Sequence, residues 1–160
     1  MFCRNAMVTN VISAGPEQTI RDALGLLEKH GIRAVPIVDG AGVLLGQFTF
    51  DVMLSKLLPS ALLMEAHGLM DANLRLDFLV DAEPDVAKRL GELLPTKLGD
   101  VMDREVQVAH PDTPLWEGIR LLVQHGSPIP VVEETSHRLL GLLSVQSATK
   151  RLAELKVELN

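Results

Sequence analysis

The chain contains one unit written twice. Residues 7–31 (MVTNVISAGPEQTIRDALGLLEKHG) align without a gap with residues 102–126 (MDREVQVAHPDTPLWEGIRLLVQHG), at an offset of 102 − 7 = 95. One residue is dropped after the shared His-Gly, and the offset returns at Gly46 and Gly141, where 141 − 46 = 95. Self-similarity at a fixed offset is the sequence signature of a repeated structural unit. The chain is therefore expected to fold as two related copies.

Each copy predicts the same order of elements. Short β-prone runs at 11–12 and 106–108 stop at Gly-Pro or His-Pro, which predicts a first strand and a turn. Apolar residues at helical spacing then predict a helix that ends at His-Gly. A strand–turn–strand segment follows, and a last helix begins at about residue 51 or about residue 147. The predicted fold is mixed α+β, with two strand–helix–strand–strand–helix units packed as a pseudo-two-fold pair around one core.

Capping residues mark where the first helix of each copy begins. Thr19 is followed three residues later by Asp22, a pattern in which each side chain bonds the other's backbone N–H. Thr113 takes the same place in the second copy, with Pro114 at the first helical position, where a missing N–H costs nothing. The sequence therefore predicts a threonine N-cap for both helices.

A proline lies inside a predicted strand of each copy. Pro36 and Pro130 cannot donate a hydrogen bond to a strand ladder. Their strands are therefore expected at a sheet edge or facing a cleft.

The segment between the copies is predicted to be helical. Residues 55–70 carry apolar side chains on most helical faces, and residues 85–94 form a second helical pattern. The predicted organisation is a first copy over residues 1–55, a helical connection over 56–97 and a second copy over 98–160.

Composition and charge exclude several classes of protein. The formal net charge is −6 and no basic run is present, which argues against a nucleic-acid surface. No apolar stretch reaches the roughly 18 residues that a membrane-spanning helix needs. Cys3 is the only cysteine, in a terminus expected to fray, so the residues cannot form a disulfide framework or a thiolate zinc site. A reducing, cytoplasmic location is expected.

Motifs for catalysis and metal binding are missing from the sequence. It contains no HExxH, no GxSxG and no Walker-type glycine loop. Acidic residues between 81 and 92 have the spacing of a calcium loop, but Val86 stands where that loop needs glycine. We expect no enzyme activity, no metal site and no required cofactor.

The repeated residues resemble a known family, the tandem cystathionine-β-synthase (CBS) domain pair. The resemblance rests on a Met-x-x-x-Val opening, His-Gly before a Val-Pro or Ile-Pro strand, and Gly-x-x-Thr/Ser before the last helix, in that order in both copies. It covers about two-thirds of the chain. It implies regulatory binding of an adenosine nucleotide (AMP, ADP or ATP) or S-adenosylmethionine in two clefts between the copies. It also implies a homodimer, to which the last helices would contribute.

The family's ligand motif, Gly-x-x-Thr/Ser-x-x-Asp, is incomplete in both copies. In the first copy Thr49 is present, but Asp51 follows it by two residues instead of three. In the second copy Ser144 is present, but Ser147 replaces the aspartate that would accept hydrogen bonds from the ribose hydroxyls. All four residues are also preferred helix caps, so a purely structural role stays open.

The resemblance implies a set of ligand-binding residues from both copies. Arg33 is the expected phosphate contact of the first site. This site is predicted to be the better one because it keeps Thr49, Asp51 and Arg33 together, whereas the second keeps only Ser144 and Ser147 and has Pro128 in place of the arginine. Lys150 and Arg151 are further phosphate candidates, with a solvated surface charge as the alternative for each cation. The full set is Val11, Ile12, Ile32, Arg33, Ala34, Pro36, Thr49, Asp51, Val106, Ile129, Pro130, Ser144 and Ser147. The competing hypothesis is a scaffold of the same fold without a nucleotide, used for dimerisation or for docking an unknown protein partner.

Overall fold

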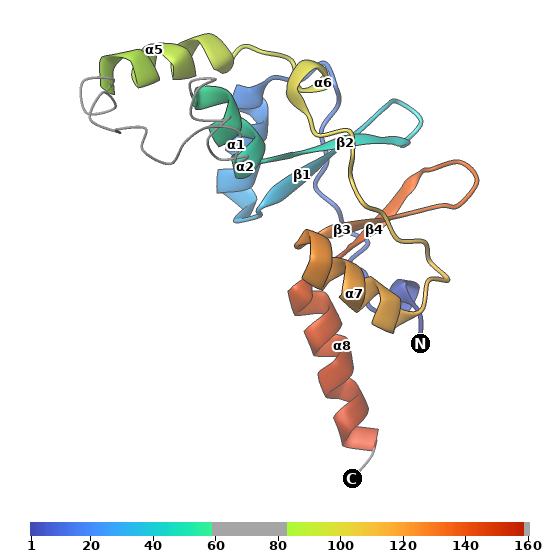
Figure 1. Ribbon diagram of the computed structural model, residues 1–160. Coiled ribbons are helices and arrows are strands. Elements are labelled where there is room, and N and C mark those ends of the chain that lie inside the picture. Colours follow the sequence, from blue (N-terminus) through green and yellow to red (C-terminus); the bar gives the residue numbers. More distant parts are fainter. Residues whose placement is uncertain (59–82, 159–160) are drawn as a thin grey trace, which may run out of the picture.

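The computed structural model describes residues 1–58 and 83–158 (Figure 1). The first copy has the elements α1 (Ile20–His30), β1 (Ala34–Val38), β2 (Leu44–Thr49) and α2 (Phe50–Leu57). The second has α7 (Leu115–His125), β3 (Ile129–Val132), β4 (Leu139–Leu143) and α8 (Val145–Glu158). Each copy contains one antiparallel hairpin, β1–β2 or β3–β4, and the two hairpins lie in the middle of the molecule. The mixed α/β class and the repeat are confirmed.

The predicted first strand of each copy is wrong. Residues 11–12 and 106–108 belong to no strand; only isolated bridges flank them. Val8 pairs with Leu142 of β4, with N–O distances of 2.8 and 2.9 Å, and Ala14 pairs in parallel with Ile37 of β1. The segment between these two anchors passes from one hairpin to the other. It therefore has no continuous neighbour with which to form a ladder.

The second copy repeats this crossing. Asp103 pairs with Gln47 of β2, and both offsets to the first copy are 95, because 103 − 8 = 95 and 142 − 47 = 95. The hairpin tips also meet, through an antiparallel bridge between Val43 and Arg138. These paired bridges confirm that the two copies are related by pseudo-two-fold symmetry.

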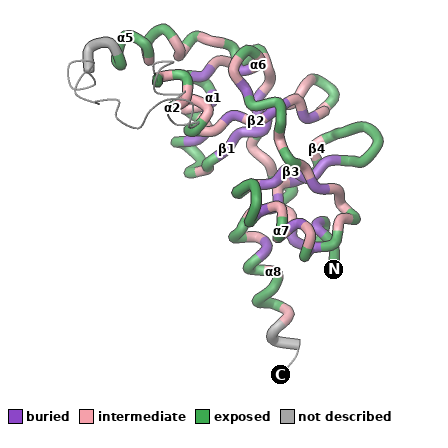
Figure 2. Tube along the Cα trace, viewed as in Figure 1, coloured by how far each residue is buried: buried purple, intermediate pink, exposed green. Residues whose placement is uncertain are grey.

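The opening segment of each copy packs in the core of the other copy. Cys3 and Ala6 are buried in a cluster built from α7, β3 and β4, and Leu98 and Met102 are buried in a cluster built from α1, β1 and β2. Figure 2 shows the buried residues gathered around the two hairpins. The expectation of one shared core is therefore wrong: the described residues form two clusters, joined by the exchange of openings.

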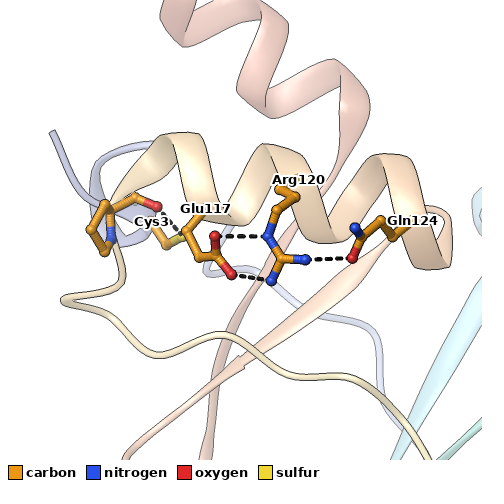
Figure 3. Close-up of polar contacts among 5 residues, drawn as sticks. Cys3, Glu117, Arg120 and Gln124 are labelled. Atoms are coloured by element: carbon orange, nitrogen blue, oxygen red, sulfur yellow. Dashed lines mark hydrogen bonds and ion pairs between the residues drawn. The ribbon is translucent and has the colours of Figure 1, made fainter.

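Cys3 lies in this core, and the expectation that its terminus frays is wrong. It belongs to the short helix η1 (Cys3–Asn5) and is fully buried, with its sulfur 4.0 Å from the Pro114 carbonyl oxygen (Figure 3). A Cβ atom on Gly118 would lie 2.6 Å from that sulfur, so the glycine makes room for it. Burial raises the pKa of the thiol.

Only one of the two threonine caps forms as predicted. Thr19 accepts a hydrogen bond from the Asp22 N–H, and the Asp22 carboxylate accepts one from the Thr19 N–H at 2.9 Å. The Thr113 hydroxyl instead accepts from the His110 N–H, and Pro114 is the N-cap of α7. The reason is the exchanged terminus: the Met1 carbonyl accepts a hydrogen bond from the Leu115 N–H at 3.0 Å, and so satisfies the helix start in place of a side chain.

Pro36 lies in β1 and Pro130 in β3, and both are edge strands because each sheet has only two strands. Both side chains are fully buried. Their carbonyl groups accept hydrogen bonds from the Ala14 and Ala109 N–H groups, at 3.0 and 2.9 Å. The edge position predicted for these strands is confirmed.

The connection between the copies is described only in part. α5 (Glu83–Leu93) confirms the helix predicted over 85–94, and α6 (Leu98–Val101) opens the second copy. Most of the predicted helix over 55–70 lies outside the described residues. No described helix is long and apolar enough to cross a membrane, and no cluster of metal-ligating side chains occurs among the described residues.

Candidate functional site

A cleft of about 630 Å³ lies between the two copies. The first copy contributes its crossing segment and the residues that lead into β1. The second contributes the residues before β3, the end of β4 and the first turn of α8. The lining residues are Val8, Asn10, Val11, Ile12, Gly31, Ile32, Arg33, Ala34, Ser127, Pro128, Leu142, Ser144, Val145 and Gln146.

The crossing segment forms one wall of the cleft. Val8 is fixed to β4 and Ala14 to β1, so residues 10–12 must span the space between the two hairpins. Val11 and Ile12 are half-buried there. The same exchange that prevents a first strand therefore places two aliphatic side chains at the interface of the copies.

The first turn of α8 supplies the hydroxyl groups. Ser144 and Ser147 cap the helix reciprocally: each Oγ accepts a hydrogen bond from the other's N–H at 3.0 Å. Ser127, from the segment before β3, accepts from the Val145 N–H at 3.2 Å. In the first turn of α8, the N–H groups of Ser144, Val145 and Ser147 thus have acceptors, and the Gln146 N–H has none among the described residues. Gln146 lines the cleft.

Arg33 is the only charged residue in the described lining. It is exposed and directly precedes Ala34, which pairs with Thr49 in the β1–β2 register. The cleft thus combines largely aliphatic walls with serine hydroxyls, amide groups and one guanidinium. Such a site suits a flat apolar ring with a polar, negatively charged substituent.

The structure brings six of the predicted site residues together. Arg33 and Ser144, which the sequence interpretation assigned to different sites, line the same cleft. The strand register also corrects the assumed equivalence with Pro128: Val35 faces Phe48 as Ile129 faces Leu143, which matches Arg33 with Ser127. The six residues are Val11, Ile12, Ile32, Arg33, Ala34 and Ser144.

The other predicted residues lie outside this lining. Ser147 is linked to the cleft lining only by its hydrogen bonds with Ser144. Thr49 caps α2, because its hydroxyl accepts a hydrogen bond from the Val52 N–H at 3.2 Å. Arg151 donates a hydrogen bond to Glu154 at 2.8 Å. The residues outside the lining are Pro36, Thr49, Asp51, Val106, Ile129, Pro130, Ser147, Lys150 and Arg151.

Sequence reasoning missed Asn10, Ser127, Gln146 and their apolar neighbours in the cleft. Their positions depend on pairing across the pseudo-two-fold axis, between residues far apart in the chain. The repeat in the sequence could have revealed these residues. Ser127 is the repeat equivalent of Arg33, so the segments that contain these two residues face each other across the pseudo-two-fold axis.

A sequence model of the CBS domain matches residues 3–59 and again residues 98–154. The chain belongs to the CBS domain family. The two matches cover the two copies and are separated by the connecting segment that contains α5. The chain is therefore a tandem CBS pair.

Relatives and solved structures agree with this fold. The CBS domain-containing protein YhcV of Bacillus subtilis (strain 168) is 24% identical over 146 residues, which cover 89% of this chain and 79% of YhcV. CBSX2 of Arabidopsis thaliana, solved in complex with AMP, has a TM-score of 0.68 and 19% identity, over 97% of this chain and 98% of CBSX2. The CBS domain pair of protein MJ0100, solved with 5′-methylthioadenosine and S-adenosyl-L-methionine, has a TM-score of 0.61 and 22% identity, over 96% and 97%.

Proposed function

We propose that this CBS pair is a regulatory module that binds an adenosyl ligand, one of AMP, ADP, ATP or S-adenosylmethionine, in the cleft between its copies. The observation that carries the proposal is the cleft itself. Its volume of about 630 Å³ lies within the roughly 300–1,000 Å³ typical of small-molecule sites. Its lining joins aliphatic walls to a few polar groups, as such sites do.

The lining suggests how an adenosyl ligand would lie. The aliphatic side chains of Val11, Ile12 and Ile32 offer apolar surface to the adenine ring. The Ser144 hydroxyl and the free Gln146 N–H stand beside one another at the start of α8, within reach of the polar part of the ligand. Arg33 offers a charge-assisted contact to an anionic substituent.

The solved relatives support the choice of ligand class. CBSX2 carries AMP, and the MJ0100 pair carries S-adenosyl-L-methionine and 5′-methylthioadenosine. All three ligands share the adenosine group and differ in what is attached to its 5′ carbon. An adenosine-sized cleft in the same fold is therefore consistent with a ligand of this class.

The module regulates and does not catalyse under this proposal. Ligand binding between the copies would alter how they are held together, and a homodimer or a protein partner would sense the change. Exposed apolar side chains on the helices, including Trp116, Val123 and Leu54, offer surface for such contacts. The reducing cytoplasm suits a chain whose single cysteine is a buried free thiol.

One observation favours a second candidate function, a docking scaffold without a nucleotide. The hydroxyls of Thr49, Ser144 and Ser127 all accept hydrogen bonds from helix N-terminal amides. These residues therefore have a structural role that needs no ligand.

A thermal-shift panel separates the two functions. A ligand that binds only the folded protein at a hundredfold excess over its Kd adds about 2.7 kcal/mol of stability. AMP, ADP, ATP and S-adenosylmethionine are each titrated against the chain, with GMP as the matched control. A rise in Tm with an adenosyl ligand and not with GMP supports the regulatory module. An unchanged Tm with all four adenosyl ligands, up to millimolar concentration, supports the docking scaffold instead.

A further inference from the structure

α1 and α7 are the equivalent helices of the two copies, and they match on one face only. Positions 20, 23 and 27 of α1 are buried, as are their equivalents 115, 118 and 122 of α7 at the offset of 95. On the outward face, α1 exposes Arg21 and Glu28 where α7 exposes Trp116 and Val123. The fold that both copies share therefore does not account for the apolar outward face of α7.

Trp116 and Val123 form one stripe along α7. They are seven residues apart, which is about two helical turns, and their side chains are 69% and 81% exposed. A tryptophan removes about 150–250 Å² from water when it is covered, and tryptophan is enriched at the centres of protein interfaces. The outward stripe of α7 therefore has the composition of a contact with another protein surface.

Arg120 lies on this stripe between the two apolar side chains. Its guanidinium donates hydrogen bonds to the Glu117 carboxylate, with 2.8 Å between Nε and Oε2, and to the side-chain oxygen of Gln124. Figure 3 shows Arg120 held along the helix between these two residues. An acid is thus followed, three residues later, by a base at a fixed position on the helix surface.

The order of these residues is complementary to itself when it is reversed. The midpoint of the stripe lies between Ile119 and Arg120, because 116 and 123 are equally far from it. When α7 of another chain lies antiparallel across this midpoint, Trp116 of each chain faces Val123 of the other, a large side chain against a small one. Glu117 of each chain then lies beside Arg120 of the other. A two-fold contact needs such a self-complementary surface, whereas a parallel arrangement would bring like charges together.

We infer that two chains associate through α7 of their second copies, in antiparallel orientation, and that α1 of the first copies lies outside this contact. The inference goes beyond the proposed function, because the pairing of α7 needs no ligand. A contact centred on one pair of helices lies at the low end of interface sizes, below about 1,200 Å². A dissociation constant in the micromolar range is therefore expected.

Sedimentation velocity of the full chain between about 1 and 200 µM tests the association. Trp116 is the only tryptophan, so its fluorescence should shift to shorter wavelength as the dimer forms. V123E buries a charge against Trp116 and should raise the dimer Kd at least about a hundredfold. E28R, at the equivalent position of α1, and L54E, at a leucine that is 51% exposed on α2, should dimerise like the parent.

A mixing experiment tests the orientation. E117R leaves two bases on the outward face of α7, and R120E leaves two acids. Each variant alone should dimerise about tenfold more weakly than the parent, because like charges then face each other. An equimolar mixture should form a heterodimer at least as tightly as the parent dimer. A change in the stability of either chain cannot produce association that occurs only on mixing, and melting curves verify that both variants are folded.

The results separate this inference from the proposed function. A parent chain that stays monomeric up to about 200 µM, a dimer that V123E leaves intact, a dimer lost in E28R or L54E, or a mixture that does not associate overturns the pairing of α7. None of these results changes the expected ligand binding, because the described cleft lining contains no residue of α7. Conversely, an unchanged Tm with every adenosyl ligand overturns the proposed function and leaves the pairing of α7 standing.

Discussion

Met7 packs directly against Gly141, the glycine three residues before Ser144 in the opposite copy. A Cβ atom on Gly141 would lie 2.9 Å from the Met7 sulfur and 2.7 Å from the Val8 carbonyl oxygen. The pseudo-symmetric pair repeats the contact, because a Cβ on Gly46 would lie 2.9 Å from the Met102 sulfur. The two glycines therefore let each exchanged opening lie flat on the other copy's hairpin.

The first prediction follows from this contact. G141A should destabilise the chain by about 1–3 kcal/mol, because the new methyl group overlaps a backbone oxygen that cannot rotate away. G46A should have a similar effect, and urea unfolding followed by circular dichroism measures both. G25A is the matched control: nothing lies within 4 Å of its new Cβ, so it should stabilise α1 by up to about 1 kcal/mol. Equal stability of G141A and the parent would show that the openings are not tightly seated.

The second prediction tests the exchange through a buried side chain. Leu98 comes from the second copy but is fully buried in the cluster of the first. L98A should cost about 2–5 kcal/mol of unfolding free energy, as for other fully buried leucines. L152A, at a leucine that is 43% exposed on α8, should change stability by less than about 0.5 kcal/mol. Similar losses in the two variants would contradict the position of Leu98.

The third prediction concerns Arg33. R33Q removes the only charged group of the described cleft lining, and hydrogen bonds to charged groups contribute about 1.5–3 kcal/mol. The Kd for ADP should therefore rise roughly ten- to a hundredfold. R21Q, at an exposed arginine on α1 outside the cleft, should bind ADP like the parent. If R33Q and R21Q bind alike, Arg33 is a solvated surface charge.

The fourth prediction is a pH dependence that arises from Cys3. Burial raises the pKa of its thiol in the folded state, whereas the unfolded thiol ionises near about 8.5. The folded state therefore holds the proton more tightly, and this contribution to stability is complete below about pH 8.5 and is lost as pH rises through the folded pKa. The unfolding free energy of the parent should fall more steeply than that of C3A between about pH 8 and 10. Parallel slopes would show that the thiol is accessible to water.

Local features could be predicted from the sequence, and features that span the two copies could not. The Thr19–Asp22 capping box, the left-handed Gly31 and the start of each last helix depend on neighbours within a few residues. The missing first strands depend on segments that cross from one hairpin to the other. The failed Thr113 cap depends on the N-terminus lying against the start of α7. Composition and periodicity record neither contact.

The candidate site was predictable to the same degree. Val11, Ile12 and Ser144 were identified because the repeat marks them in each copy separately. Their partners in the cleft were misassigned because the opening of one copy joins the last helix of the other. Thr49 and Asp51 were expected beside Arg33 in the better site, yet the cleft that contains Arg33 includes neither of them.

The exchanged openings also bear on how the chain folds during synthesis. Domains usually form as units while the ribosome extends the chain, with the N-terminal one first. Here α1, β1 and β2 cannot pack against Leu98 and Met102 until residue 102 has emerged from the ribosome. Cys3 cannot be buried until α7 has also been synthesised. Contacts between such distant residues slow folding, because the loop between them must close before the contacts can stabilise it. The nascent first half therefore exposes part of its apolar surface until the second half arrives to cover it.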